Sequence, residues 1–325
     1  MKRTFQYVIT ILLLLTIPYT LFARGEAEQS LTKDTRPRIA VSIIPQEYVV
    51  DRIAGSLADT VVLVGPGQSP HSYEPTPRQM ASLSQAQAWI TSNTDFELAL
   101  RPKISSMYPS LRIVDGTEGV VFRSLEEHHH EEAHDDEDHD DLYEHDDHED
   151  ERHHAGEIDR HTWLGREPMK IMAAKVAETL ISLDPNNTET YQRNLNAFHA
   201  DIDTLFSQLE ADLASLRGTT VFVYHPSFGY LLDEFGIHQR AVETGGKEPT
   251  ARALSELIGE AREAQPEAIF VQAQFPTQAA RTVAETIGAQ VLPLDPLAYD
   301  WLANIEIIGE TLRRTLIFTD EGGPQ

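Results

Sequence analysis

TETYQRNLNAFHADIDTLFSQLEADLASL, residues 188–216, is the stretch that organises the chain. It contains no Pro or Gly, and its apolar side chains recur every three or four positions: Tyr191, Leu195, Phe198, Ile202, Leu205, Leu209, Leu213 and Leu216. This spacing predicts one amphipathic helix over 188–216, roughly 43 Å long at about 1.5 Å per residue. Two shorter helices with an unmarked break between them are the alternative.

Short apolar strands alternate with helical segments on both sides of this helix. The expected strands are 36–44, 61–65, 88–92 and 111–116 before it, and 219–225, 238–244, 268–274 and 289–295 after it. Such alternation is typical of parallel α/β sheets. We therefore expect an α/β fold with two similar lobes, each a four-stranded parallel sheet with flanking helices, bridged by one long helix. The expected lobes span 37–187 and 217–320.

The N-terminus has the features of a secretory signal peptide. Lys2 and Arg3 precede the apolar run YVITILLLLTIPYTLFA, and small or weakly polar residues follow near Ala23. We expect residues 1–24 to be a signal peptide and the mature protein to be periplasmic, with an uncleaved membrane anchor as the alternative. The 325 residues include no Cys, which excludes disulfides, a lipid anchor on Cys and thiolate metal sites.

An acidic, histidine-rich run interrupts the first lobe. The chain has a formal net charge of −26, and residues 126–154 contribute sixteen acids and one Arg to it. This composition predicts a disordered loop over 124–157, because it offers little apolar surface to bury. The absence of a Lys/Arg-rich patch argues against nucleic acid and against anionic lipid surfaces as partners. Nine histidines lie in the run: His128, His129, His130, His134, His139, His145, His148, His153 and His154.

Four polar side chains lie at or just beyond predicted strand ends or at the return from the acidic run. They are His71, His161, His225 and Asp295. Ligands in open α/β sheets bind beyond the carboxyl ends of the strands. Neutral imidazoles with one carboxylate suit Zn²⁺ in a four-coordinate site between the lobes. The alternative for each His is an ordinary surface or core residue, which is what we expect of His199 and His238.

Several motifs resemble one known family. HSYEPTP (71–77), DRHTWLG (159–165), YHPSFGYLLDEFG (224–236), ETGGKEPTARALSELI (243–258) and LDPLAYDW (294–301) occur in the order found in metal-binding solute-binding proteins of ABC importers. The chain is most similar to the periplasmic zinc-uptake (ZnuA-like) branch, over residues 38–318 without the acidic loop. The resemblance implies two lobes joined by a long helix, with the transported metal bound at their interface by His71, His161, His225 and Asp295.

The resemblance also implies which metal is carried and by what system. A Glu typically stands in the manganese branch where His225 stands here, and three imidazoles favour zinc. Zinc-uptake proteins often carry a His-rich run at this place, so the run is expected to collect metal weakly. The partners implied are an ABC permease and its cytoplasmic ATPase, and we expect a monomer. In some relatives, water or another acid completes the shell in place of the carboxylate that Asp295 matches.

Residues behind the ligands are expected to orient them. Glu74 is the candidate beside His71, and Tyr224 and Ser227 are the candidates beside His225. A manganese or iron importer and a periplasmic zinc chaperone are alternative functions. A zinc hydrolase with Glu74 or Glu243 as base is a further alternative, but no HExxH, GxSxG or P-loop motif is present. We therefore expect a binding protein with no catalytic residues.

Overall fold

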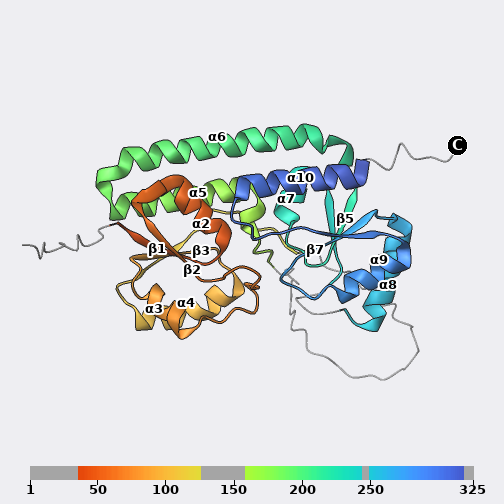
Figure 1. Ribbon diagram of the computed structural model, residues 1–325, viewed down its shortest axis with the longest axis horizontal. Helices are drawn as coiled ribbons and strands as arrows, with labels where there is room; N and C mark the ends of the chain where they lie inside the picture. The colour runs from red at the N-terminus through yellow and green to blue at the C-terminus, as the bar shows by residue number, and fades with distance from the viewer. Residues whose placement is uncertain (1–35, 126–157, 244–248, 318–325) are drawn as a thin grey trace, which may run out of the picture. The chain divides into compact units, whose positions relative to one another are not determined.

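Two four-stranded sheets, all parallel, form the framework of the computed structural model, which describes residues 36–125, 158–243 and 249–317. The strand orders are β2-β1-β3-β4 and β6-β5-β7-β8, so the two sheets repeat one topology (Figure 1). The strands are β1 Arg38–Val41, β2 Asp59–Val62, β3 Ala88–Thr91, β4 Arg112–Asp115, β5 Thr220–Val223, β6 His238–Ala241, β7 Ala268–Val271 and β8 Gln290–Pro293. The predicted fold class is confirmed.

Nine α-helices flank and connect these strands in the described residues. They are α2 Ile44–Ala54, α3 Pro77–Leu83, α4 Asp95–Met107, α5 Arg166–Leu183, α6 Thr188–Asp212, α7 Gly229–Glu234, α8 Ala251–Ala264, α9 Gln278–Ile287 and α10 Trp301–Ile317. Within the described ranges, none of them is both long and apolar enough to cross a bilayer. We call residues 36–125 with 158–187 the N-terminal lobe, and 213–317 the C-terminal lobe.

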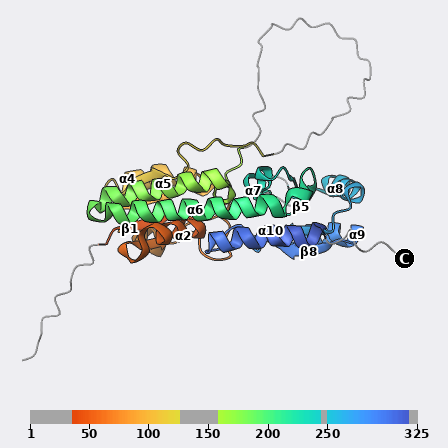
Figure 2. The same cartoon turned by 90° about the horizontal axis from the view of Figure 1, so that it is seen from above.

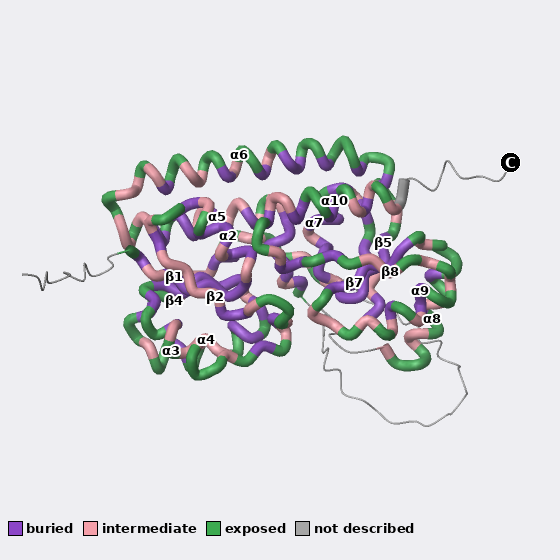
Figure 3. Tube along the Cα trace, in the orientation of Figure 1, coloured by how far each residue is buried: buried purple, intermediate pink, exposed green. Residues whose placement is uncertain are grey.

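Helix α6 is continuous, so the alternative of two broken helices is wrong. It ends at Asp212, and a 3-10 turn at Ala214–Leu216 completes the stretch expected to be helical. It packs against α2, α5 and α10 (Figures 1 and 2). Along α6, buried positions alternate with exposed ones (Figure 3). Gly309 of α10 allows close approach, since a Cβ there would overlap the Leu209 side chain.

The two lobes share one apolar core. A single cluster of buried side chains includes Ile39 and Trp89 of the first lobe, Phe198 of α6, and Phe270 and Trp301 of the second lobe. A second cluster lies in the C-terminal lobe, between its sheet and helices α8 and α9. Because protein interiors are close-packed, a shared core resists large hinge motion between the lobes.

Two tryptophans connect the segment after His161 to the end of the C-terminal lobe. Trp163 donates its indole N–H to the Pro296 carbonyl at 2.8 Å. Trp301 donates its indole N–H to the Trp163 carbonyl at 2.7 Å. Both rings are buried, so these bonds are shielded from water and fix the segment that carries His161 against the other lobe.

Candidate metal centre

Three histidines from separate segments meet beyond the carboxyl ends of the strands. His71 lies in the loop after β2, His161 precedes a 3-10 turn at Thr162–Leu164, and His225 follows β5. The Nε2 atom of His161 lies 3.2 Å from that of His71 and 3.0 Å from that of His225. In the described part of the chain these residues form a group whose possible ligand atoms all lie within 4.8 Å of one another.

A carboxylate stands behind each imidazole. The Nδ1 atoms of His71, His161 and His225 lie 3.3 Å from Asp95 Oδ2, 2.8 Å from Asp159 Oδ1 and 2.6 Å from Glu243 Oε1, in that order. An ionised carboxylate only accepts hydrogen bonds, so each contact assigns the proton to Nδ1 and leaves Nε2 bare. Such carboxylate–histidine pairs orient metal-binding imidazoles and raise their basicity.

Three bare nitrogen lone pairs pointing at one place repel one another unless a cation lies among them. A tetrahedral zinc ion with Zn–N bonds of about 2.05 Å separates its ligand nitrogens by about 3.3 Å. The observed Nε2 separations of 3.0 and 3.2 Å are close to that value. The arrangement is therefore suited to holding a divalent metal ion.

His225 is held in its neutral form by its surroundings. Burial, together with the neighbouring His161 and His71, holds its pKa well below the ordinary value of 6.5. Its ring is stacked on Phe275, with centroids 4.4 Å apart and planes 26° apart. A neutral imidazole is the form that binds metal, so His225 stays ready to bind in acid that would protonate a free imidazole.

The acids behind His71 and His161 stay ionised for two different reasons. A hydrogen bond with His71 lowers the pKa of Asp95 despite partial burial. Burial alone would raise the pKa of Asp159, but its bonds with His161 and Arg123 outweigh burial and hold the pKa below the ordinary value. Both carboxylates therefore remain acceptors for Nδ1–H at neutral pH.

Gln272, just after β7, fixes the backbone of the loop that carries His225. Its amide oxygen accepts a hydrogen bond from His225 N at 3.1 Å, and its amide nitrogen donates to His225 O at 2.8 Å. The same nitrogen donates to the Ser227 hydroxyl at 3.2 Å. Ser227 thus contacts the loop and not the imidazole. Tyr224 is buried in the apolar cluster, with its ring tilted against Phe275.

Asp295, expected as the fourth ligand, is not part of the cluster. It is exposed, and its Oδ1 accepts hydrogen bonds from Leu297 N at 2.9 Å and Gln274 Nε2 at 3.4 Å. In the sheet, β7 lies between β5, which leads to His225, and β8, which leads to Asp295. The neighbour of β5 on its other side is β6, and the loop after β6 brings Glu243 to His225.

The other expected residues lie away from the imidazoles or outside the described residues. Glu74 is exposed, and no hydrogen bond joins it to His71 in the described part of the chain. The nine histidines of the acidic run and the signal peptide lie outside the described residues. The segments that flank the run are joined, since Ser124 pairs with Ile158 in an isolated antiparallel bridge. That bridge is one residue from Asp159, which supports His161.

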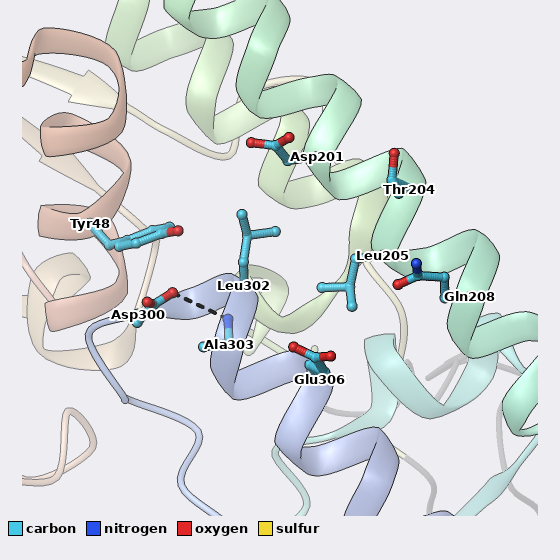
Figure 4. A pocket seen from close by; sticks show the side chains of 9 residues that line it. All are labelled: Tyr48, Asp201, Thr204, Leu205, Gln208, Asp300, Leu302, Ala303 and Glu306. Atoms are coloured by element: carbon cyan, nitrogen blue, oxygen red, sulfur yellow. Dashed lines mark hydrogen bonds between the residues drawn. The ribbon is translucent and has the colours of Figure 1, made fainter.

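A groove of about 400 Å³ lies elsewhere on the surface, between α2, α6 and α10 (Figure 4). Its lining includes Tyr48, Asp201, Asp300 and Glu306, and none of the three clustered histidines. Because its lining contains no histidine and its acids are accessible to water, it does not compete with the histidine cluster as a metal centre.

Asp95, Asp159, Gln272 and Phe275 were not found by sequence reasoning. Asp159 sits in the quoted motif DRHTWLG, two residues before His161, and that spacing was the available signal. The other three follow strands β3 and β7, so a search for polar residues after every strand would have found Asp95 and Gln272. Nothing in the local sequence indicates that Phe275 stacks on His225.

Comparison with known proteins agrees with this geometry. A family model described as zinc-uptake complex component A, periplasmic (ZnuA), matches residues 39–313. The high-affinity zinc uptake system protein ZnuA of Yersinia pestis is 26% identical over 262 residues, which cover 80% of this chain and 82% of that protein. The protein of the same name from Brucella abortus (strain 2308) is 27% identical over 295 residues, which cover 85% and 88%.

Solved structures share the fold as well. A crystal structure of ZnuA matches with a TM-score of 0.75 and 30% identity, covering 86% of this chain and 99% of that one. The family match, at residues 39–313, spans both sheets and all three clustered histidines. The chain therefore belongs to the ZnuA family of periplasmic zinc-uptake components.

Proposed function

We propose that this protein captures Zn²⁺ in the periplasm through His71, His161 and His225 and delivers it to an ABC permease driven by a cytoplasmic ATPase. The observation that carries the proposal is the convergence of three Nε2 atoms, each on an imidazole whose Nδ1 faces a carboxylate. The zinc-uptake names of the relatives support it.

Zinc is the metal that the donor set favours. Nitrogen ligands suit Zn²⁺, whereas Mn²⁺ prefers carboxylate, carbonyl and water oxygens. The three nearest carboxylates face Nδ1 atoms, so they support the imidazoles and do not replace them as ligands. A ZnuA deletion mutant whose structure was solved with zinc bound matches this chain at 30% identity and a TM-score of 0.74. This likeness favours zinc over the manganese or iron alternative.

Metal enters and leaves on the His71 side of the cluster. The His71 side chain is 28% exposed, against 5% for His161 and 7% for His225. Because the lobes share one core, the change on release is a movement of the His71 loop and not a wide opening of the lobes. Water completes the zinc shell in this scheme, since Asp295 lies outside the cluster.

Export and weak metal collection complete the proposal. Residues 1–24 direct the chain to the periplasm, in agreement with the family description. The histidines of residues 126–154 bind Zn²⁺ loosely and raise its concentration near His161, because the segments that flank the run are joined by the bridge between Ser124 and Ile158, next to Asp159.

A zinc hydrolase is the rival with a specific observation behind it. Three histidines leave a coordination position open, and an open position is typical of catalytic zinc. The candidate base Glu243, however, lies 2.6 Å from His225 Nδ1 and serves to orient it, and Glu74 is exposed. The family is also one of solute-binding proteins.

Competitive metal titration tests the proposal. Protein purified without a His tag and stripped of metal should bind Zn²⁺ far more tightly than Mn²⁺. His225→Ala should abolish tight zinc binding, while deletion of 126–154 should change the zinc Kd by less than about tenfold. Tight zinc binding that survives His225→Ala and disappears with the deletion would overturn the assignment.

A second experiment separates uptake from a zinc chaperone. Permease and ATPase genes beside this one favour uptake. Cells that lack the protein should accumulate ⁶⁵Zn slowly from zinc-poor medium and recover with the wild type but not with His225→Ala. Normal accumulation in cells without the gene would refute the transport role and favour the chaperone.

A further inference from the structure

Arg123 lies in a partly buried ion-pair cluster where the two lobes meet. Its Nη1 donates to Asp159 Oδ2 at 2.8 Å, and its Nε donates to Asp233 Oδ2 at 2.8 Å. Asp159 belongs to the N-terminal lobe and Asp233 to α7 of the C-terminal lobe. The exposed fractions of the side chains are 15% for Arg123, 0% for Asp159 and 50% for Asp233.

The surroundings hold this guanidinium in one place. Arg123 N donates to the Tyr230 hydroxyl at 3.1 Å, and that hydroxyl donates to Asp159 O at 3.0 Å. Asp159 N donates to Arg123 O at 2.9 Å. Gly229, the first residue of α7, has no side chain to displace the arginine, since a Cβ there would overlap Arg123 Nη1. The close approach therefore requires Gly at this position.

Asp159 divides its two oxygens between the arginine and the metal centre. Oδ2 accepts from Arg123, while Oδ1 accepts from His161 Nδ1 at 2.8 Å and from His161 N at 2.9 Å. The guanidinium therefore fixes how the Asp159 carboxylate is rotated. That carboxylate in turn fixes the rotation of the His161 ring. A planar guanidinium can do this for two carboxylates at once, whereas an ammonium is a point charge.

We propose that Arg123 is a positioning residue for the metal centre: it holds Asp159 in register with His161 and joins this hydrogen-bonded chain to α7 of the other lobe. The inference rests on the proposed zinc site. The strong contact is the one with Asp159, because a fully buried carboxylate that loses its cation is left uncompensated. The contact with half-exposed Asp233 is weaker, as exposed ion pairs usually are.

Two variants break the same contact in different ways. Arg123→Met removes the cation. Gly229→Ala keeps the cation, but its Cβ would overlap Arg123 Nη1 and press on Asp159 Oδ2, and so separate the two groups. Each should raise the zinc Kd about 3- to 20-fold, less than the loss of a directly bonded carboxylate can cost. Arg123→Lys should recover part of the affinity lost in Arg123→Met. The double variant should bind no more weakly than Arg123→Met alone, because both changes act through one contact.

Co²⁺ bound to the protein gives a readout that general destabilisation does not move. Its d–d absorption depends on ligand geometry, so the spectrum should shift in both single variants. Arg38→Met is the matched control. Arg38 pairs with Asp59 at 2.7 Å, near the amino ends of β1 and β2, so this variant should leave both the zinc Kd and the Co²⁺ spectrum unchanged.

The outcomes distinguish this inference from the proposed function. Unchanged zinc Kd and Co²⁺ spectrum in folded Gly229→Ala would overturn it, and so would multiplicative effects of Gly229→Ala and Arg123→Met. In either case His225→Ala still abolishes tight binding if the proposed site is right. Tight binding by His225→Ala would instead overturn the site itself, and with it the role of Arg123.

Discussion

Replacement of Glu243 by Gln tests whether the carboxylates behind the imidazoles set the zinc affinity. Glu243 Oε1 lies 2.6 Å from His225 Nδ1, and the two side chains are 1% and 7% exposed. Gln has nearly the same shape, so packing is preserved while the charge is removed. Its carbonyl can still accept from Nδ1–H, but the bond becomes one between neutral groups.

The expected magnitude follows from this change of bond type. A hydrogen bond to a charged group contributes about 1.5–3 kcal/mol, and a neutral one roughly half as much. The difference is about 0.8–1.5 kcal/mol, which at about 1.4 kcal/mol per tenfold raises the zinc Kd about 4- to 12-fold. Loss of support behind a metal-bound imidazole generally costs about 10- to 100-fold.

Chelator competition at pH 7.5 measures this change, and Asp184→Asn is its control. Asp184 follows α5 at the end remote from His161, and its Oδ2 accepts hydrogen bonds from Tyr191 Oη at 2.8 Å and Asn187 Nδ2 at 2.6 Å. This control should lower the free energy of unfolding by about 1 kcal/mol, because it weakens these bonds, but it should change the zinc Kd by less than about threefold.

The reasoning would be refuted if Glu243→Gln bound zinc as tightly as the wild type. It would also be refuted if Asp184→Asn weakened zinc binding to the same extent, because the effect would then follow from the loss of any hydrogen-bonded carboxylate. Urea denaturation of both variants without metal separates stability from affinity.

Three further predictions concern stability, pH and the fourth ligand. Phe198→Ala should lower the free energy of unfolding by about 3–5 kcal/mol in urea, because the fully buried ring packs against Tyr48 and Trp301; a loss below 1 kcal/mol would contradict this. The depressed pKa of His225 means that below about pH 6.5 the unfolded chain binds a proton that the folded chain does not. Urea titrations of the zinc-free protein should therefore give a lower free energy of unfolding at pH 5.5 than at pH 7.5, and this difference should be smaller in His225→Asn. Equal differences in the wild type and the variant would count against the prediction. Asp295→Ala should leave the zinc Kd within about threefold by calorimetry, and a loss of tenfold or more would make Asp295 a ligand.

The fold was largely accessible from the sequence because its signals are local. The expected strand at 61–65 begins earlier in the structure, at Asp59–Val62, and the expected helix at 188–216 ends at Asp212. Both differences, of two to four residues, lie at element ends, where backbone hydrogen bonding is incomplete and boundaries are least sharply defined. The apolar period within each element depends on neighbours in the chain, and it was read correctly.

The site was only partly accessible, because it depends on which strands are neighbours. His71, His161 and His225 could be expected near one another from their places after strands and after the acidic run. Asp295 meets the same criterion, yet β7 separates its strand from the one that leads to His225. Strand order results from how whole helices and sheets pack, and no single stretch of residues records it.

By itself the sequence determined the α/β class, the long helix, the histidines available as ligands and the family resemblance. Only the tertiary structure decided that Asp95, Asp159 and Glu243 each support one imidazole, and that Arg123 reaches across to α7. The physical reason is the distance along the chain between the interacting residues. Helix and strand periodicity arise between residues a few positions apart, whereas each of these contacts except that of Asp159 joins side chains eighteen or more positions apart.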